Sequence, residues 1–336
     1  MTGPRPLPHH AVEAALAPLR RSGEGALEVA GREVRFRHAD RRLFPTGETK
    51  ADLLAYMLAM APVLLPHLED RPLTFTRYPH GTEGRGFFQK NRPAGAPPWL
   101  TTATVGRTCH VLARTAAELA LFSQWAAVEI HVPAFRLGPA RRPETDRLII
   151  DLDPMPPAGW RETQRAARGV RRLLEGVGVA SYPKLSGATG LHVLVPVRPR
   201  AGGLTTAQIA RALGLLLSRA APELYTIAWQ VRRRRGVLVD YNQNAVGRTM
   251  AVAYGVRPGP HAPVSPPVAW DEVPEVAPGA WTIATVPDRV RRLGDLSLRL
   301  LGPPEPVAPL EELACEVLGT HGGMPLPAPP ATPGRG

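Results

Sequence analysis

Two acidic residues stand at the end of an apolar run in the segment LIIDLDP. Asp151 and Asp153 are two positions apart, and on a β-strand that spacing points both carboxylates to one face. Two anions so placed repel each other unless a cation lies between them. Carboxylate oxygens favour hard divalent ions such as Mg²⁺ or Mn²⁺. The pattern therefore predicts a metal site, and a cap on a turn before Pro154 is the alternative.

A third acid, Asp240, ends another apolar run, GVLVDY. By itself it could equally be a turn residue. Three carboxylates on neighbouring strands can hold two cations about 3.5–4 Å apart, which activates an attacking hydroxyl and stabilises a leaving phosphate. Asp151, Asp153 and Asp240 are therefore the predicted catalytic and metal-binding residues of a phosphoryl-transfer enzyme.

The turn SGATGLH lies between these acidic segments in the sequence. Backbone N–H groups at Ser186, Gly187 and Gly190, together with the serine hydroxyl, could surround a phosphate. His192 enters the strand that follows. Many glycine-containing turns bind nothing, and a single histidine is more often structural. This segment therefore indicates a phosphate site only in combination with the three acids.

Basic and aromatic residues alternate in the segment RYPHGTEGRGFFQKN, which contains Phe87 and Phe88. Such a mixture suits phosphates and bases, and an ordinary hairpin with one core phenylalanine is the alternative. The whole chain has 41 Lys and Arg against 29 Asp and Glu, a formal charge of +12. That excess is typical of proteins that neutralise phosphates, although a high-GC genome also raises the Arg content and can produce a solvated basic surface.

The remaining composition narrows the class of protein. Cys109 and Cys315 are too few for a disulfide framework or a thiolate zinc site. The N-terminus lacks the apolar segment of a signal peptide, and residues 53–65, the longest apolar stretch, are too short to span a bilayer. We therefore expect a cytoplasmic, nucleoid-associated protein without a membrane partner.

Apolar periodicity predicts the elements that position these groups. A hairpin is expected with Ala30 and Gly31 at its turn, and Thr49 with Asp52 predicts a helix start. A strand carries Glu129 and His131. Helices are expected over residues 50–68, 116–127, 159–177, 205–221 and 288–301. The expected organisation is a flexible extension (1–26), a body with two lobes (27–140 and 141–301), and a Pro/Gly-rich tail (302–336) with one short helix (310–318).

The ordered motifs DLDP, SGxxGLH, DYxQN and YxVR resemble the polymerase domain of bacterial ATP-dependent DNA ligase D in a free-standing form, within the archaeo-eukaryotic primase superfamily. DRRLFPTGETKADLLAYM and RYPHGTEGRGFFQKN extend the resemblance over about residues 27–300. It implies an α/β (α+β) fold with a mixed, largely antiparallel central sheet flanked by helices, and an N-terminal lobe. It also implies template-directed addition of nucleotides or ribonucleotides to 3′ ends at gaps or broken DNA ends in non-homologous end joining.

The resemblance assigns roles to individual residues. The three aspartates match its metal ligands and imply two Mn²⁺ or Mg²⁺ ions. Residues that match or adjoin the nucleotide triphosphate site are His131, Ser186, Gly187, His192 and Arg257. Residues that match or adjoin the DNA site are Arg41 and Lys50, for a 5′-phosphate, and Phe87, Phe88 and Lys90, near the bases.

The sequence departs from the family pattern at Thr189, where a lysine is usual. One contact to the triphosphate is then missing or is supplied by Arg233 or Arg248. The implied partners are gapped or broken DNA with a 5′-phosphate, NTP or dNTP, Ku, and a separate DNA ligase. A primer-initiating primase, a non-catalytic 5′-phosphate-end-binding module and a nuclease are the alternatives. Retention of all three acids disfavours the non-catalytic module, and a nuclease would need a water-activating base that the sequence does not identify.

Overall fold

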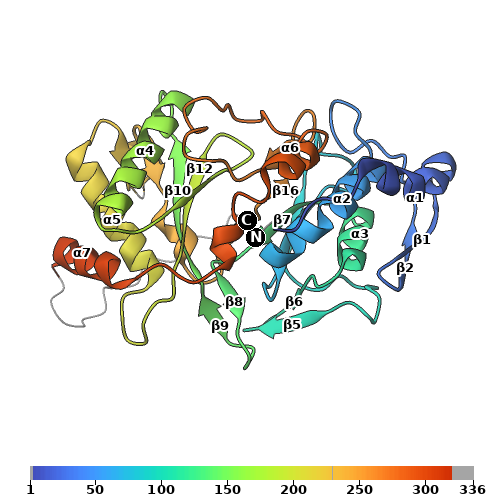
Figure 1. Ribbon diagram of the computed structural model, residues 1–336, viewed down its shortest axis with the longest axis horizontal. Helices are drawn as coiled ribbons and strands as arrows, with labels where there is room; N and C mark the ends of the chain where they lie inside the picture. The colour runs from blue at the N-terminus through green and yellow to red at the C-terminus, as the bar shows by residue number, and fades with distance from the viewer. Residues whose placement is uncertain (1–2, 229, 320–336) are drawn as a thin grey trace.

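The computed structural model describes residues 3–228 and 230–319. The protein is elongated, and two α/β halves lie side by side along its long axis (Figure 1). One half contains the helices α4 (Trp160–Gly176) and α5 (Thr206–Ala220), and the other contains α2 (Lys50–Leu68) and α3 (Ala116–Gln124). Each half has its own hydrophobic core.

A five-stranded sheet forms the centre of the half that contains α4 and α5. Its strand order is β11 (Tyr182–Leu185), β12 (Leu191–Pro196), β10 (Arg147–Pro154), β14 (Val237–Val239) and β13 (Tyr225–Thr226). Only β13 and β14 pair in parallel within this sheet. The expected mixed, largely antiparallel sheet is therefore confirmed.

Strand β10 separates the two hydrophobic cores. Ile150 and Leu152 are buried in the core that includes α4 and α5, whereas Ile149 is buried in the other core. Because successive side chains of a strand alternate between its faces, Asp151 and Asp153 lie on the face of Ile149. The sheet therefore turns both carboxylates toward the other half of the molecule.

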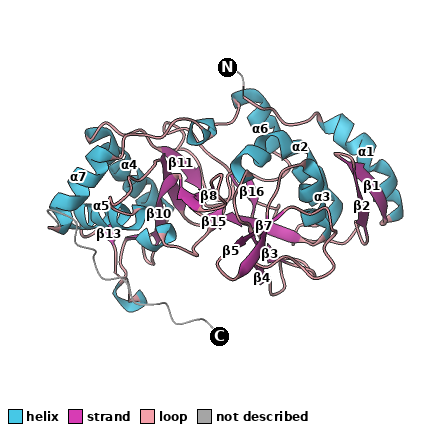
Figure 2. Ribbon diagram, turned by 90° about the horizontal axis from the view of Figure 1, so that it is seen from below, coloured by secondary structure: helices cyan, strands magenta, loops and turns pink. Residues whose placement is uncertain are grey.

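A four-stranded sheet belongs to the other half, in the order β15 (Met250–Ala251), β7 (Ala127–Val132), β3 (Thr74–Arg77) and β4 (Phe87–Gln89). Figure 2 shows β15 near the centre of the molecule, beside β7. Helix α2 begins at the predicted residue because Thr49 and Asp52 cap it reciprocally. By length and composition α2 could cross a membrane, but 72% of its apolar window is buried inside the protein, as in a core helix.

The remaining elements are short. They are β1 (Gly25–Val29), β2 (Arg32–Phe36), β5 (Thr102–Val105), β6 (Thr108–Val111), β8 (Phe135–Leu137), β9 (Pro143–Thr145), β16 (Gly255–Val256), β17 (Val264–Ser265), and the 3-10 turns η1 (Val231–Arg233), η2 (Tyr241–Asn244) and η3 (Leu298–Leu301). β1 and β2 form the predicted hairpin, with Ala30 and Gly31 at positive φ.

The N-terminal segment is not a flexible extension over most of its length. Residues His9–Ser22 form helix α1, and Val12, Leu16 and Leu19 are buried in the core that also contains α2. Their spacing places them on one face of a helix, so that the segment has apolar surface to bury. The prediction of a loosely attached extension rested on the Pro, Arg and Gly content around a short helical pattern, and local composition does not show that this helix packs on the core.

The predicted lobe boundaries and C-terminal helices also need correction. Strands β15 and β16 and helix α6 (Val286–Leu293) return to the half that was expected to end at residue 140, and Tyr254 and Val290 are buried in its core. Helix α6 ends at Leu293 because Gly294 adopts φ 76°. Helix α7 (Ala308–Leu318) packs against α5, so residues 308–318 are not a loose tail. Residues 320–336 lie outside the described part of the chain.

Candidate active site

The three predicted acids meet where β10 and β14 lie side by side. Asp151 pairs in register with His192 on β12, and Asp153 pairs with Leu238 on β14. Asp240 follows the last residue of β14, and its amide donates to the carbonyl oxygen of Asp151 at 2.9 Å. Strand pairing therefore brings together carboxylates that are distant in the sequence.

Burial and mutual repulsion raise the pKa of both carboxyl groups on β10. For Asp151 burial is the largest cause, followed by the charges of Asp153 and Asp240, and for Asp153 burial is followed by the charge of Asp240. One oxygen of Asp151, Oδ1, is buried without a hydrogen-bond partner among the described residues. The pair is therefore unfavourable as two bare anions.

His192 does not neutralise this charge. Its Nε2 lies 3.3 Å from Asp151 Oδ1. Burial, together with the charges of Lys184 and Arg257, holds the pKa of His192 well below its usual range. The imidazole is therefore neutral at pH 7, and the negative charge of the aspartates stays without a compensating cation.

The acidic pair fits a divalent ion. An unpartnered carboxylate oxygen beside a second carboxylate offers the hard ligands that Mg²⁺ and Mn²⁺ prefer. Over residues 3–228 and 230–319, no three His, Cys, Asp or Glu side chains converge on one metal position. Asp240 is close enough for its charge to raise the pKa of both other acids, and its Oδ1 accepts a hydrogen bond from the Asn242 amide at 3.0 Å. Asp151 and Asp153 would hold such an ion, with Asp240 as a third acid at the site.

The SGATG turn forms one wall of a cavity beside the acids. The cavity is about 200 Å³ in volume. Its lining residues are His131, Asp151, Asp153, Ser186, Ala188, Thr189, His192, Gln243, Thr249, Met250, Ala251 and Arg257. Ser186 Oγ accepts the amides of Ala188 and Gly190 at 3.1 and 3.0 Å, and Gly187 has φ 74°. The serine hydroxyl shapes the turn and keeps its own hydrogen for a ligand oxygen.

Gly190 leaves no room for a side chain at this wall. A Cβ there would lie 2.6 Å from the Leu152 carbonyl oxygen and 2.8 Å from Asp153 Oδ1. We expect Gly190→Ala to lower kcat/KM for nucleotide addition by about 10²-fold, because it displaces a carboxylate that must be positioned closely. Steady-state primer extension checks this. Gly176→Ala, where a Cβ meets nothing within 4 Å, is the matched control, and equal activity of the two variants would contradict the prediction.

Strand β7 contributes His131 to the lining of the cavity, and it also carries Glu129, to which the sequence analysis assigned no role. Arg257 Nη1 lies 2.7 Å from Glu129 Oε1, and Tyr78 Oη donates to Oε2 at 3.1 Å. Burial raises the pKa of Glu129, but His131, whose Nε2 lies 3.8 Å from Glu129 Oε1, and the charge of Arg257 outweigh it and lower this pKa to about 2. Glu129 therefore fixes the guanidinium of Arg257 at the cavity. The alternation in VEIHV, which places Glu129 and His131 on one face, was the available signal.

Two further polar residues near Asp151 also had no predicted role. Lys184 is buried on β11, and its Nζ donates to the Leu185 carbonyl oxygen and to Ser265 Oγ. Burial and the charge of Arg257 lower the pKa of Lys184 to about 7. Gln243 forms a hydrogen bond with Asp151 and lines the cavity. The DYxQN motif contained Gln243, whereas nothing in the sequence marked Lys184 as buried.

This arrangement of carboxylates beside a polar cavity can be compared with known protein families. The family model described as LigD, primase-polymerase domain, matches residues 49–297. The chain belongs to the LigD primase-polymerase family. Members of this family are DNA-directed nucleotidyltransferases.

Individual relatives agree with the LigD assignment. The bifunctional non-homologous end joining protein LigD of Bacillus subtilis is 34% identical over 266 residues, which is 78% of this chain and 43% of that protein. The multifunctional LigD of Pseudomonas aeruginosa is 31% identical over 300 residues, or 87% of this chain and 35% of that protein. The chain therefore spans less than half the length of these curated relatives.

A solved LigD structure supports the fold. The polymerase domain from Mycobacterium tuberculosis ligase D, solved in complex with DNA, aligns with a TM-score of 0.75 at 34% identity. The alignment covers 81% of this chain and 99% of that chain. The primase-polymerase fold predicted from the sequence is therefore confirmed.

The residues predicted to bind the nucleotide divide into those that line the cavity and those that do not. His131, Ser186, His192 and Arg257 line the cavity. Arg233 and Arg248 are exposed and do not line it. In the same arginine run, the charge of Arg234 lowers the pKa of Asp153. The structure thus brings Arg234, rather than the predicted Arg233, into electrostatic reach of the acids.

Arg41 and Lys50 lie together, as a phosphate site requires. The Lys50 amide donates to the Arg41 carbonyl oxygen at 2.9 Å, and Lys50 Nζ donates to the Arg37 carbonyl oxygen at 2.8 Å. Burial, followed by the charge of Arg41, lowers the pKa of Lys50 to about 8. The positive charges of Arg41 and Lys50 repel each other, and a phosphate dianion bound between them would relieve that repulsion.

The aromatic pair lies on β4, close to the cavity. Phe87 and Phe88 are 45% and 70% exposed, which excludes the alternative of core phenylalanines. The Phe88 ring lies 5.9 Å from the ring of His131, which lines the cavity, and the Arg77 guanidinium lies 5.4 Å from the Phe87 ring. Lys90 follows β4 and is exposed. These groups form an open surface that bases can stack on.

Proposed function

We propose that this protein adds nucleotides or ribonucleotides to 3′ ends at gaps and broken DNA ends, in non-homologous end joining. The observation that carries the proposal is the pair of buried Asp151 and half-buried Asp153 beside a polar cavity, in a chain of the LigD primase-polymerase family. The formal charge of +12 supports binding to DNA.

Each wall of the cavity has a part in the proposed reaction. Asp151 and Asp153, with Asp240, would hold divalent ions, which we propose to be two Mn²⁺ or Mg²⁺ ions. When bound, they favour ionisation of the primer 3′-hydroxyl and offset the charge of the triphosphate. Arg257, oriented by Glu129, and the Ser186 hydroxyl bind triphosphate oxygens. The neutral His192 adds hydrogen bonding without further charge.

The DNA and protein partners extend the same proposal. Arg41 and Lys50 would bind a 5′-phosphate on the far side of the gap, and Phe87, Phe88 and Lys90 would meet the bases. Ku and a separate DNA ligase would provide end recognition and sealing. A protein that acts on chromosomal breaks would lie in the cytoplasm, at the nucleoid.

The test is extension of a labelled primer on a gapped template, with and without a 5′-phosphate, in Mn²⁺ or Mg²⁺ and with either nucleotide set. We expect template-matched addition by the wild type and none by Asp151→Ala combined with Asp153→Ala. If the wild type adds nothing while still binding DNA, the catalytic proposal fails and the end-binding alternative takes its place.

Thr189 offers a prediction about nucleotide affinity. It is exposed at the cavity, where the family usually has a lysine. We expect Thr189→Lys to lower KM for the nucleotide by about tenfold, because a lysine there gains a charge-assisted contact to the triphosphate. Steady-state kinetics over a nucleotide titration measures this. Thr104→Lys adds the same charge on the exposed face of β5, and a similar fall in KM for that variant would show a general effect of charge instead.

A further inference from the structure

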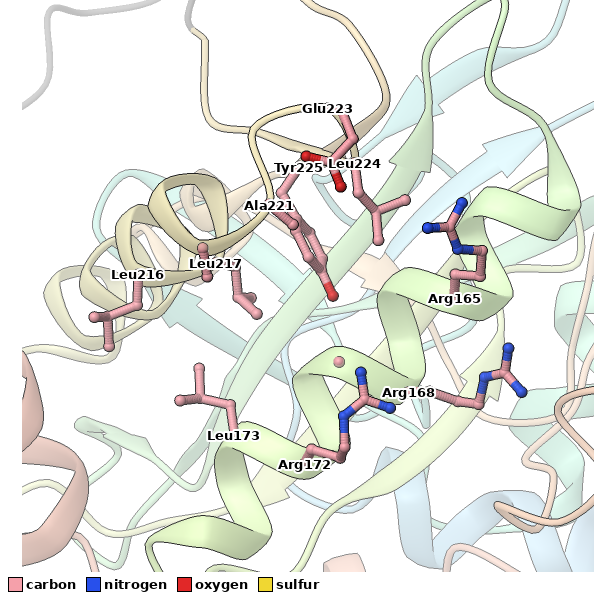
Figure 3. A pocket seen from close by; sticks show the side chains of 12 residues that line it. Arg165, Arg168, Arg172, Leu173, Leu216, Leu217, Ala221, Glu223, Leu224 and Tyr225 are labelled. Carbon is pink, nitrogen blue, oxygen red and sulfur yellow. The ribbon is translucent and has the colours of Figure 1, made fainter.

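A second pocket lies on the outer side of the half that contains α4 and α5. It has a volume of about 630 Å³ and lies between these two helices and the segment that leads into β13. Figure 3 shows Arg165, Arg168 and Arg172 in a row along α4. The leucine side chains of α4 and α5 and the ring of Tyr225 lie beside this row. We refer to this pocket as the α4–α5 groove.

The three arginines of the groove share one helix face. Their spacing of three and four residues places them side by side, with about 10 Å of helix axis between the first and the last. All three are exposed, and within the described chain none of them forms an ion pair or hydrogen bond. Their neighbour Arg171, in contrast, is paired with Glu175 at 2.7 Å. One acid, Glu223, also lines the groove, but among the described residues no ion pair joins it to these arginines. The groove therefore keeps an excess of positive charge.

The floor of the groove is apolar and closely built. Leu173 and Leu216 remain half-buried there, with Leu217 below them. Tyr225 Oη donates to the Ala166 carbonyl oxygen at 2.8 Å. A Cβ on Gly169 would lie only 1.9 Å from Tyr225 Oη. Glycine at that position lets the tyrosine lie against α4. The floor is thus a fixed surface of leucine and tyrosine atoms rather than a gap between mobile side chains.

The groove is separate from the cavity that contains the acids. Helices α4 and α5 cover the face of β10 that carries Ile150 and Leu152, whereas Asp151 and Asp153 lie on the other face. No lining residue is shared between the groove and the cavity. An occupant of the groove would therefore leave the catalytic surface free.

We infer that the α4–α5 groove is a docking site for an acidic, leucine-bearing helical segment of a partner protein. Leucine side chains of such a helix would cover the apolar floor, and glutamates or aspartates on the adjacent face would meet the arginine row. A nucleic-acid backbone would satisfy the arginines but leave the leucines uncovered, so the observations favour the peptide. This function goes beyond nucleotide addition, because it tethers the polymerase without occupying its site.

The experiment is fluorescence anisotropy with a labelled synthetic peptide of about 16 residues, in which Leu and Glu occupy adjacent faces of a helix. We expect the full chain to bind it, and the combined variant Arg165→Glu, Arg168→Glu and Arg172→Glu to bind it at least about tenfold more weakly. The variant Arg107→Glu, Arg142→Glu and Arg198→Glu makes the same charge change at exposed sites outside the groove and should bind as the wild type does.

Further measurements test whether the groove variant is folded and whether another kind of molecule occupies the groove. Primer extension by the groove variant should stay within about twofold of the wild type, which shows that it is folded. A second variant, Leu216→Gln, should weaken the peptide without changing any charge. The proposal is overturned if the peptide does not bind, if a version with Gln for every Glu binds equally well, or if the groove variant instead loses affinity for a DNA duplex. It is also overturned if light scattering finds a dimer that only the groove variant loses, because the occupant would then be a second copy.

Discussion

Asparagine in place of Asp153 should abolish nucleotide addition and at the same time stabilise the metal-free protein. The amide keeps the shape of the side chain but removes the charge that a divalent ion requires, so we expect a loss of at least about 10³-fold in kcat. Primer extension on a gapped template measures this. Asp271→Asn, an exposed change of the same kind, should leave the rate unchanged.

The stability half of this prediction follows from the direction of the pKa shifts. Burial, followed by the neighbouring carboxylates, raises the pKa of Asp151 and Asp153 above its usual range in the folded protein. A group shifted this way contributes stability that is present at low pH and is lost as the pH rises through the folded pKa. At pH 7 the metal-free site is therefore destabilising, and Asp153→Asn removes one of its repelling charges.

Thermal unfolding with and without metal separates the two effects. Without metal, Tm of Asp153→Asn should exceed that of the wild type at pH 7, and the difference should shrink as the pH is lowered. Added Mn²⁺ should raise Tm of the wild type but not of the variant. If the variant unfolds earlier without metal, or if Mn²⁺ stabilises both proteins equally, the acidic pair is not the metal site.

Local sequence signals predicted the elements that hold this site. The capping pair Thr49 and Asp52 set the start of α2, and the apolar run before Asp151 predicted a buried strand. In both places the information lies within a few residues, as a hydrogen bond or an alternation of faces. The motifs around Ser186 and Asp240 similarly led to the cavity and to the end of β14.

Features that depend on distant contacts were missed. Glu129 gains its importance from Arg257, and Lys184 from its burial beside Ser265, so neither is marked by its own neighbours in the sequence. Helix α1 packs on a core formed largely by later residues. The return of β15 and α6 to the first half arises from pairing and packing with β7 and α2, which no local pattern specifies.

Arg71 supports the junction between the two halves, and its replacement by alanine should destabilise the protein by about 3 kcal/mol or more. Its side chain is fully buried and donates to the carbonyl oxygens of Pro133 and Phe135 at 3.1 and 2.9 Å. It also pairs with Asp146, directly before β10, at 3.0 Å. Alanine removes a donor from both carbonyl oxygens and opens a cavity, although Asp146 keeps its contact with Arg136. Breaking a buried ion pair typically costs about 3–5 kcal/mol. Chemical denaturation measures the change in free energy of unfolding.

Arg136 provides the matched control because it contacts the same carboxylate from a more exposed position. Its Nε lies 3.1 Å from Asp146 Oδ2, and 23% of its side chain is exposed. Solvent screening weakens such a pair, so Arg136→Ala should cost no more than about 1 kcal/mol. If both variants lose the same stability, the charge on Asp146 is what matters. A larger loss for Arg71→Ala instead shows that the buried side chain of Arg71 and its backbone hydrogen bonds stabilise the start of β10 beyond the charge on Asp146, and with it the strand that carries the two acids.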